Sequence, residues 1–284
     1  MKGLNLKAGV SLIRPLNCAM IGFAVIVGEF VSKPPAIPLL YSVFGYLTGF
    51  FICAYSMVVN DVYDVEVDRV NQPSRPLPSG KVTSRGAIRL SVALLLAGLA
   101  SSTLTLSVWA LLIAGAYSLL SWLYSVRAKK AGIYGNLIVA SSLAIPFIYG
   151  GVIAGGTALG SLLLIMALTS FLAGVGREVV KAIADIPGDA KRGIKSLAIA
   201  QGTGRAAAAG AALFLSAVLA SWLPFLVGSA NLLYSLGVVL PDLIFAYLAV
   251  SILRKPSAAN AMVVKRVALL GMLVGLFVFV GGAL

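Results

Sequence analysis

The chain has 284 residues, of which 60% are hydrophobic and 11% charged, and its mean hydropathy is +1.01. These values lie far outside the range of a soluble domain and indicate a polytopic membrane protein. The formal net charge is +13, which would also suit a nucleic-acid-binding protein, but the placement of the basic residues argues against that class. The sequence has no histidine, the commonest general base and transition-metal ligand, so we expect any metal to be bound by oxygen.

Nine apolar stretches of about 20 residues are candidate transmembrane spans. The first contains Arg14, Pro15 and Asn17 and has no small-residue cleavage site, so we expect a retained helix and not a signal peptide. The sequence therefore predicts an all-α membrane protein with nine transmembrane helices and a single domain over residues 1–284. The expected spans are 10–31, 37–59, 84–104, 107–125, 134–154, 158–180, 205–225, 231–253 and 264–283.

The basic residues gather at alternate ends of these spans. Of the 22 Lys and Arg residues, only Lys33 falls on the opposite side. This positive-inside pattern predicts a multi-pass protein of the cell membrane with its N-terminus in the cytoplasm. The two long polar segments, 60–83 and 177–204, lie on the same cytoplasmic side and are expected to be loops. Topology and anionic lipids account for most of the basic charge, and no nucleic-acid partner is expected.

The first acidic segment follows the second span and contains Asn60, Asp61, Asp64 and Asp68. A helix advances about 100° per residue, so Asn60, Asp64 and Asp68 lie on one face, with Asp61 one turn from Asp64. Carboxylates this close repel one another unless cations join them. Mg2+ is usually held by carboxylate oxygens, with a phosphorylated substrate completing its shell. We interpret this segment as half of a Mg2+–pyrophosphate site.

A second acidic pair, Asp185 and Asp189, follows the sixth span on the same side. Their spacing would stack the carboxylates on one helical face, although Pro187 and Gly188 predict that the helix ends there. Taken alone, the pair could belong to a surface turn. If the two acidic segments meet, they can hold two Mg2+ ions. Seven of the nine acidic residues lie in these segments: Asp61, Asp64, Glu66, Asp68, Glu178, Asp185 and Asp189.

Four further residues with titratable side chains lie inside predicted spans. Glu29 lies near the far end of the first span, and Asp242 lies beside Pro241 in the eighth. An intramembrane carboxylate such as Asp242 is either functional or a partner for backbone groups that the proline frees. Cys18 and Cys53 show no partnered spacing and are expected to be packing residues.

These residues suit the ionisation of an allylic diphosphate. Mg2+ and basic side chains neutralise the charge on the departing pyrophosphate, and a water-poor cavity protects the carbocation until a hydroxyl or aromatic carbon captures it. Because the chain has no histidine, a site carboxylate or the released pyrophosphate must accept the proton. Tyr63 and Tyr124 lie nearest the motifs and are candidates to stabilise the cation.

The first acidic segment also closely resembles a family motif. Asn60-Asp61-x-x-Asp64-x-x-x-Asp68, followed by Arg69-x-Asn71-x-Pro73-x-Arg75-Pro76-Leu77-Pro78-Ser79-Gly80, is similar to the first aspartate-rich motif of the UbiA-type intramembrane prenyltransferases. Asp185-x-x-x-Asp189, with Gly193-Ile194-Lys195-Ser196 behind it, resembles their second motif. The likeness extends over essentially the whole chain. It implies a nine-helix bundle whose cytoplasmic-face active site binds a prenyl diphosphate through two Mg2+ ions.

The resemblance also implies roles for individual residues. The metal ligands would be Asn60, Asp64, Asp68, Asp185 and Asp189, with Asp61 in support. Lys129 or Lys130 would match the lysine that contacts the diphosphate, and Arg14 and Asn17 would match a polar pair at the start of the first helix. The expected catalytic residues are Asp64, Asp68, Asp185, Asp189 and Lys129. The expected substrate-binding residues are Arg14, Asn17, Asp61, Arg75, Tyr124, Ser125, Lys130, Arg177 and Lys181.

Within this family, the segments 124–136 and 176–179 look most like the archaeal branch, the digeranylgeranylglyceryl phosphate synthases. The branch implies a geranylgeranyl diphosphate donor and an acceptor hydroxyl on geranylgeranylglyceryl phosphate, in the synthesis of archaeal ether phospholipids. One departure is Ala182, where relatives often carry an acidic residue after the lysine that is here Lys181. The acceptor's phosphate would suit the surplus basic residues Arg75, Arg127, Arg177 and Lys181.

Other functions remain open from the sequence. An aromatic polyprenyltransferase of quinone synthesis, acting on 4-hydroxybenzoate, would need the same metal site. A cation-coupled transporter would also carry carboxylates at helix ends, although those of this chain gather at one face and not at the midplane. A CDP-alcohol phosphotransferase would need Asp-Gly and Ala-Arg elements that are missing from residues 60–69. The sequence predicts membrane lipids as partners and assigns no oligomeric state.

Overall fold

A computed structural model describes residues 6–32, 38–155, 159–191 and 193–283. All regular elements in these ranges are helices. Eight of the described helices are long and apolar enough to cross a membrane, and a bent helix pair brings the number of candidate spans to nine. The all-α, nine-helix prediction is therefore confirmed.

The chain forms two compact units. Unit 1 comprises Met1–Ile26 and Ala36–Ala128, and unit 2 comprises Val27–Pro35 and Lys129–Leu284. The boundary between them falls within helix α2 (Pro15–Val31). That the whole chain acts as a single domain stays a prediction.

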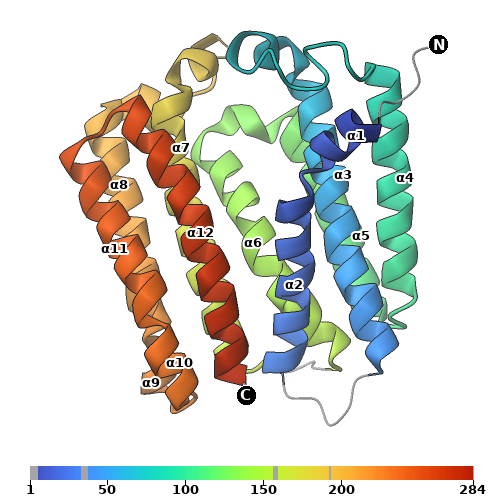
Figure 1. Cartoon of the computed structure of the whole chain (residues 1–284), viewed down its shortest axis with the longest axis vertical. Coiled ribbons are helices and arrows are strands. Elements are labelled where there is room, and N and C mark those ends of the chain that lie inside the picture. Colours follow the sequence, from blue (N-terminus) through green and yellow to red (C-terminus); the bar gives the residue numbers. More distant parts are fainter. Residues whose placement is uncertain (1–5, 33–37, 156–158, 192, 284) are drawn as a thin grey trace. The chain divides into compact units, whose positions relative to one another are not determined.

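Unit 1 is organised around the long helix α3, which packs against α1, α4 and α5 (Figure 1). Its core contains the buried residues Leu12, Val58 and Ala87. The pair α1 and α2 is bent by 46° at Arg14, whose φ is +55°. The following Pro15 disfavours helical geometry at Arg14 and suits the first position of the next helix, which explains the break. The helices are α1 (Leu6–Ile13), α3 (Leu39–Asn71), α4 (Ser84–Thr103) and α5 (Val108–Val126).

Helix α3 is longer than its apolar sequence suggests. The expected span ends at residue 59, but the helix continues to Asn71, so the prediction that the first acidic segment is a loop was wrong. Residues 60–72 contain neither proline nor glycine, and an Arg69–Glu66 ion pair of 2.8 Å supports the last turns. Hydropathy marks where the apolar surface ends, whereas the helix ends only just before Pro73.

Unit 2 is built around α7, which packs against α6, α8 and α12, while α11 packs against α8 and α12 (Figure 1). The buried core includes Phe214, Leu248 and Ile252. Small residues allow close helix contacts, since a Cβ on Gly176 of α7 would lie 3.2 Å from the Gly210 carbonyl oxygen of α8. The elements are η1 (Ala128–Ala131), α6 (Ile133–Ile153), α7 (Ser161–Lys191), α8 (Leu197–Ser221), α9 (Leu223–Leu226), α10 (Leu232–Gly237), α11 (Val239–Arg254) and α12 (Ala258–Ala283).

Helix α7 continues through Pro187 and Gly188, so the predicted helix end at these residues was also wrong. Proline removes only one backbone donor, and the helix is closed one turn later. The Ile194 N–H donates to the Asp189 carbonyl over 3.0 Å, and the Gly193 N–H donates to the Ala190 carbonyl over 3.1 Å. Gly193 has a φ of +65°, which is the left-handed glycine of a Schellman cap. Both acidic segments consequently lie on helices.

The packing generates a prediction for two helical glycines. A methyl group on Gly28 of α2 would overlap the Phe147 carbonyl of α6, whereas one on Gly115 of α5 would meet open space. We expect Gly28→Ala to lower the thermal unfolding temperature in detergent clearly. Gly115→Ala should leave it unchanged or raise it slightly, because alanine favours a helix by about 1 kcal/mol over glycine. Equal effects of the two substitutions would contradict the described packing.

Candidate functional site

The acidic face of α3 is buried within unit 1. Asp61, Asp64 and Asp68 are only 3%, 5% and 5% exposed, and the Asn60 Nδ2 donates to Asp64 Oδ2 over 3.0 Å. Asn60 and Asp64 are thus neighbours one turn apart on a single helix face, with Asp68 one further turn along. The structure places the predicted residues of the first motif on one acidic face.

Two arginines from outside α3 neutralise part of this face. Arg14 Nη2 lies 2.6 Å from Asp61 Oδ1, and Arg75 Nη1 lies 2.5 Å from Asp68 Oδ2 and 3.4 Å from Asp61 Oδ1. Arg14 Nη1 also lies 3.2 Å from Met57 Sδ. Buried carboxylates are costly without such partners. Arg75 therefore bridges two aspartates, while Arg14 joins the bend before α2 to α3.

The segment that carries Arg75 is a compact, proline-rich turn between α3 and α4. The Arg75 N–H donates to the Gln72 carbonyl over 3.0 Å, and the Ser79 N–H donates to the Arg75 carbonyl over 3.0 Å. Leu77 and Val82 are buried beside α3 in the core of unit 1. These contacts fix the backbone of the turn, so the Arg75 guanidinium is held over the acidic face.

The donor atoms on α3 fit a Mg2+ ion. Amide and carboxylate oxygens are the hard ligands that this ion prefers, and it commonly takes one or two protein carboxylates together with water and substrate phosphate oxygens. In the described part of the chain, no three acidic side chains converge on one point. On α3, two of the carboxylates are already paired with arginines, Asp61 with Arg14 and Asp68 with Arg75. Asn60 and Asp64 by themselves offer too few oxygens for an ion, so further oxygens from Asp68 or from a ligand would be needed.

The second acidic pair lies near the end of α7 in unit 2, where Asp185 and Asp189 are both partly exposed. Two turns before Asp185, Glu178 is buried and accepts from Arg177 Nη1 over 2.7 Å and from Lys181 Nζ over 2.9 Å. Glu178 was not among the predicted site residues. The sequence does hold a signal for it. Glu178 is three residues before Lys181 and seven before Asp185, which places all three on one side of a helix.

The turn η1, which carries Lys129 and Lys130, packs beside the loop that follows α7. Gly132, at a φ of +59°, sits against the Lys195 carbonyl so closely that any Cβ would overlap it. This contact brings the backbone of the two predicted diphosphate-binding lysines next to the segment behind the second motif. The side chains of Lys129 and Lys130 lie outside the described residues.

Three other predicted site residues occupy helix ends in unit 1. The Asn17 N–H donates to the Arg14 carbonyl over 3.0 Å in the first turn of α2. The buried Ser125 hydroxyl donates to the Ser121 carbonyl of its own helix over 3.0 Å, and Tyr124 is half-buried at the end of α5. Their roles in substrate binding stay predictions.

The Asp242 carboxylate accepts hydrogen bonds from other side chains of unit 2. It accepts from the Ser221 hydroxyl over 3.0 Å and from Trp222 Nε1 over 2.8 Å. The hydroxyl of Tyr234 donates to the Ser221 carbonyl over 2.6 Å. Asp242 thus joins α11 to the end of α8 through side chains and not through the backbone beside Pro241.

Comparisons of the sequence and of the structure with known proteins point to the same family. The model of the UbiA prenyltransferase family matches residues 21–273. The digeranylgeranylglyceryl phosphate synthase of Methanocaldococcus jannaschii is 35% identical over 280 residues, which cover 99% of this chain and 97% of that protein. A solved structure of a digeranylgeranylglyceryl phosphate synthase superposes with a TM-score of 0.76 at 35% identity and covers 98% of each chain. A UbiA homologue from Archaeoglobus fulgidus, bound to GPP and Mg2+, shares the fold with a TM-score of 0.69 at 19% identity, over 96% of this chain and 99% of that one.

The ion pairs on α3 generate a stability prediction. Among the described residues, Arg14→Met leaves the buried Asp61 charge with only the 3.4 Å contact to Arg75, so we expect a loss of roughly 1–3 kcal/mol in the free energy of unfolding. Adding Asp61→Asn should recover part of the loss, because it removes the unpaired charge. Arg69→Met is the control, since its pair with Glu66 is exposed and should contribute less than about 1 kcal/mol. A double variant less stable than Arg14→Met would contradict this account.

Proposed function

We infer the function from the premise that this chain belongs to the UbiA prenyltransferase family. The protein is a multi-pass membrane prenyltransferase. It transfers a geranylgeranyl group from geranylgeranyl diphosphate to the hydroxyl of geranylgeranylglyceryl phosphate, forming an ether bond and releasing pyrophosphate. The observation that carries this conclusion is the likeness, over nearly the whole chain, to digeranylgeranylglyceryl phosphate synthase in both sequence and structure.

The acidic residues are proposed to bind Mg2+ with the donor diphosphate. Asn60, Asp64 and Asp68 would hold one ion, and Asp185 and Asp189 a second. When bound, the ions neutralise the charge that grows on the departing pyrophosphate. The oxygen-only donor sets and the absence of histidine from the chain support Mg2+ over a transition metal.

The basic residues supply donors for phosphate oxygens. The side chain of Arg75 is 25% exposed, so its guanidinium can reach a diphosphate while it remains beside Asp68. Lys129 and Lys130 are proposed to contact the same group from η1. Asp61 is proposed to act as a positioning residue, because its carboxylate holds both Arg14 and Arg75.

Ionisation of the donor and capture of the carbocation require a cavity that orients both substrates and excludes water. Ionisation of the allylic C–O bond gives a carbocation, and the acceptor oxygen attacks C1 as its proton leaves for a site carboxylate or for the released pyrophosphate. Tyr124, Ser125 and Asn17 are proposed to contact substrate at the ends of α5 and α2. Topology is proposed from the charge pattern, with the protein in the cell membrane and its N-terminus and active site at the cytoplasmic face. Lys33, the exception to that pattern, lies outside the described residues.

Product formation by the purified protein in detergent tests the acceptor. Labelled geranylgeranyl diphosphate is supplied with geranylgeranylglyceryl phosphate or with 4-hydroxybenzoate, in Mg2+ or in EDTA. We expect transfer to the glyceryl phosphate only, and only in Mg2+. Transfer to the aromatic acid instead would assign the protein to quinone synthesis. The absence of any transfer would contradict the proposed activity.

Substitution of one aspartate in each motif tests the metal site. We expect Asp64→Asn and Asp189→Asn each to reduce turnover by roughly 100-fold or more, because each removes charge stabilisation at the leaving group. Glu66→Gln is the matched control, since its side chain is 79% exposed and paired with Arg69, and should keep wild-type turnover. Normal activity in either aspartate variant would refute the assignment of its motif.

A further inference from the structure

One stripe of α7 carries both an acidic pair and a basic cluster. Glu178, Lys181, Asp185 and Asp189 follow one another at spacings of three, four and four residues, which places them on one side of the helix. Lys181 precedes Asp185 by one turn, or about 6 Å of helix rise. A ligand group bound at Lys181 would therefore lie next to the second motif.

A third cation joins this stripe from α12. The Arg177 Nε donates to the Lys265 backbone carbonyl over 3.4 Å, and the Lys265 ammonium interacts electrostatically with Lys181, Asp185, Arg177 and Glu178. Within the described part of the chain, this ammonium has no carboxylate at ion-pair distance. We term Arg177, Lys181 and Lys265 the α7–α12 basic cluster. Its three cations lie near two carboxylates, those of Glu178 and Asp185, and so leave a net positive charge.

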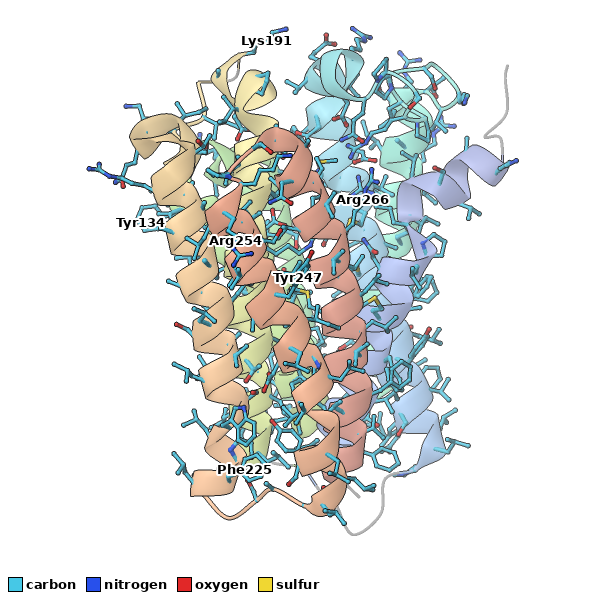
Figure 2. The ribbon with its side chains drawn as sticks, turned by 60° about the vertical axis from the view of Figure 1, so that its left-hand side comes forward. Tyr134, Lys191, Phe225, Tyr247, Arg254 and Arg266 are labelled. Carbon is cyan, nitrogen blue, oxygen red and sulfur yellow. The ribbon has the colours of Figure 1, made fainter. Side chains whose placement is uncertain are left out.

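The burial of these side chains assigns them different roles. Glu178 is 5% exposed and uses both oxygens to hold Arg177 and Lys181, whose side chains are 20% and 31% exposed. Lys265 is also half-buried. The glutamate thus fixes the cations, which keep accessible surface for a ligand. Membrane topology explains exposed cations such as Arg254 and Arg266 (Figure 2), but it does not explain a half-buried excess of positive charge, which is costly without an anion.

We propose that the α7–α12 basic cluster binds the phosphate group of the acceptor, with Glu178 as a positioning residue. The proposal rests on the proposed function. A phosphate monoester carries a charge of about −1.5 to −2 near neutral pH, which is complementary in sign to the net positive charge of the cluster. In the acceptor, the phosphate and the free hydroxyl are on neighbouring carbons and are only a few ångströms apart. A phosphate site one turn from Asp185 therefore leaves the hydroxyl beside the second motif.

Lys265 is the specificity-determining residue that the sequence did not indicate. It lies in the apolar ninth span, outside both motifs, and 80 positions after Asp185. An acceptor without a phosphate would leave its charge unmatched, so the cluster favours a phosphorylated lipid over its dephosphorylated counterpart.

Steady-state kinetics of Lys265→Gln test this site, with the neighbouring exposed residue as control. For each variant, KM is measured for geranylgeranyl diphosphate, for geranylgeranylglyceryl phosphate and for geranylgeranylglycerol, which lacks the phosphate. We expect Lys265→Gln to raise KM for the phosphorylated acceptor roughly 10- to 100-fold and to leave KM for the donor and for geranylgeranylglycerol near wild type. Arg266→Gln should match wild type throughout, and Lys265→Arg should restore most of the preference for the phosphate.

The outcomes separate this inference from the function on which it rests. Wild-type protein that fails to prenylate geranylgeranylglyceryl phosphate overturns both. Wild-type protein that prenylates it, with an unchanged preference for phosphate in Lys265→Gln, overturns the phosphate site alone. An equal rise of KM for all three substrates would indicate a structural role for Lys265 and would also overturn the site. If Lys265→Gln does not fold, Lys181→Gln tests the same cluster from α7 with the same expected result.

Discussion

Buried carboxylates in an apolar helix bundle need cations, and the local geometry of both units follows from this constraint. In unit 1, Arg14 and Arg75 come from a helix break and a proline-rich turn to reach Asp61 and Asp68. In unit 2, Arg177 and Lys181 hold Glu178. The irregular segments are therefore fixed by the charges that they satisfy. The same side chains are proposed to bind an anionic substrate, in which case the groups that stabilise the fold also form the site.

The sequence predicted the helices better than it predicted their ends. Hydropathy located the nine spans because each needs an apolar length that matches the bilayer. It placed Asn60–Asp68 and Asp185–Asp189 in loops, since polar residues follow the apolar stretch. The helices continue because residues 60–72 contain no breaker and because Gly193, not Pro187, supplies the cap of α7. Helix length depends on backbone chemistry, which hydropathy does not measure.

The sequence was a still poorer guide to which side chains contact one another within the site. The helical period indicated that Asn60 and Asp64 are neighbours, but Arg14 and Asp61 are 47 residues apart, and Arg177 and Lys265 are 88 apart. Contacts of this kind depend on how helices pack, so spacing alone could not find them. The assignment of Lys129 and Lys130 came from family resemblance, to which the structure adds the Gly132–Lys195 contact.

The central proposal, which comes from the resemblance to the UbiA-type prenyltransferases, is that Asp64 and Asp189 serve the same diphosphate through Mg2+. Equilibrium binding of unreactive geranylgeranyl thiodiphosphate in Mg2+, to wild type, Asp64→Asn, Asp189→Asn and the double variant, tests it most directly. Residues that serve one ligand are energetically coupled, so the account predicts that the double variant loses clearly less affinity than the two single losses together. Strictly additive losses, or undiminished binding in either single variant, would contradict the account.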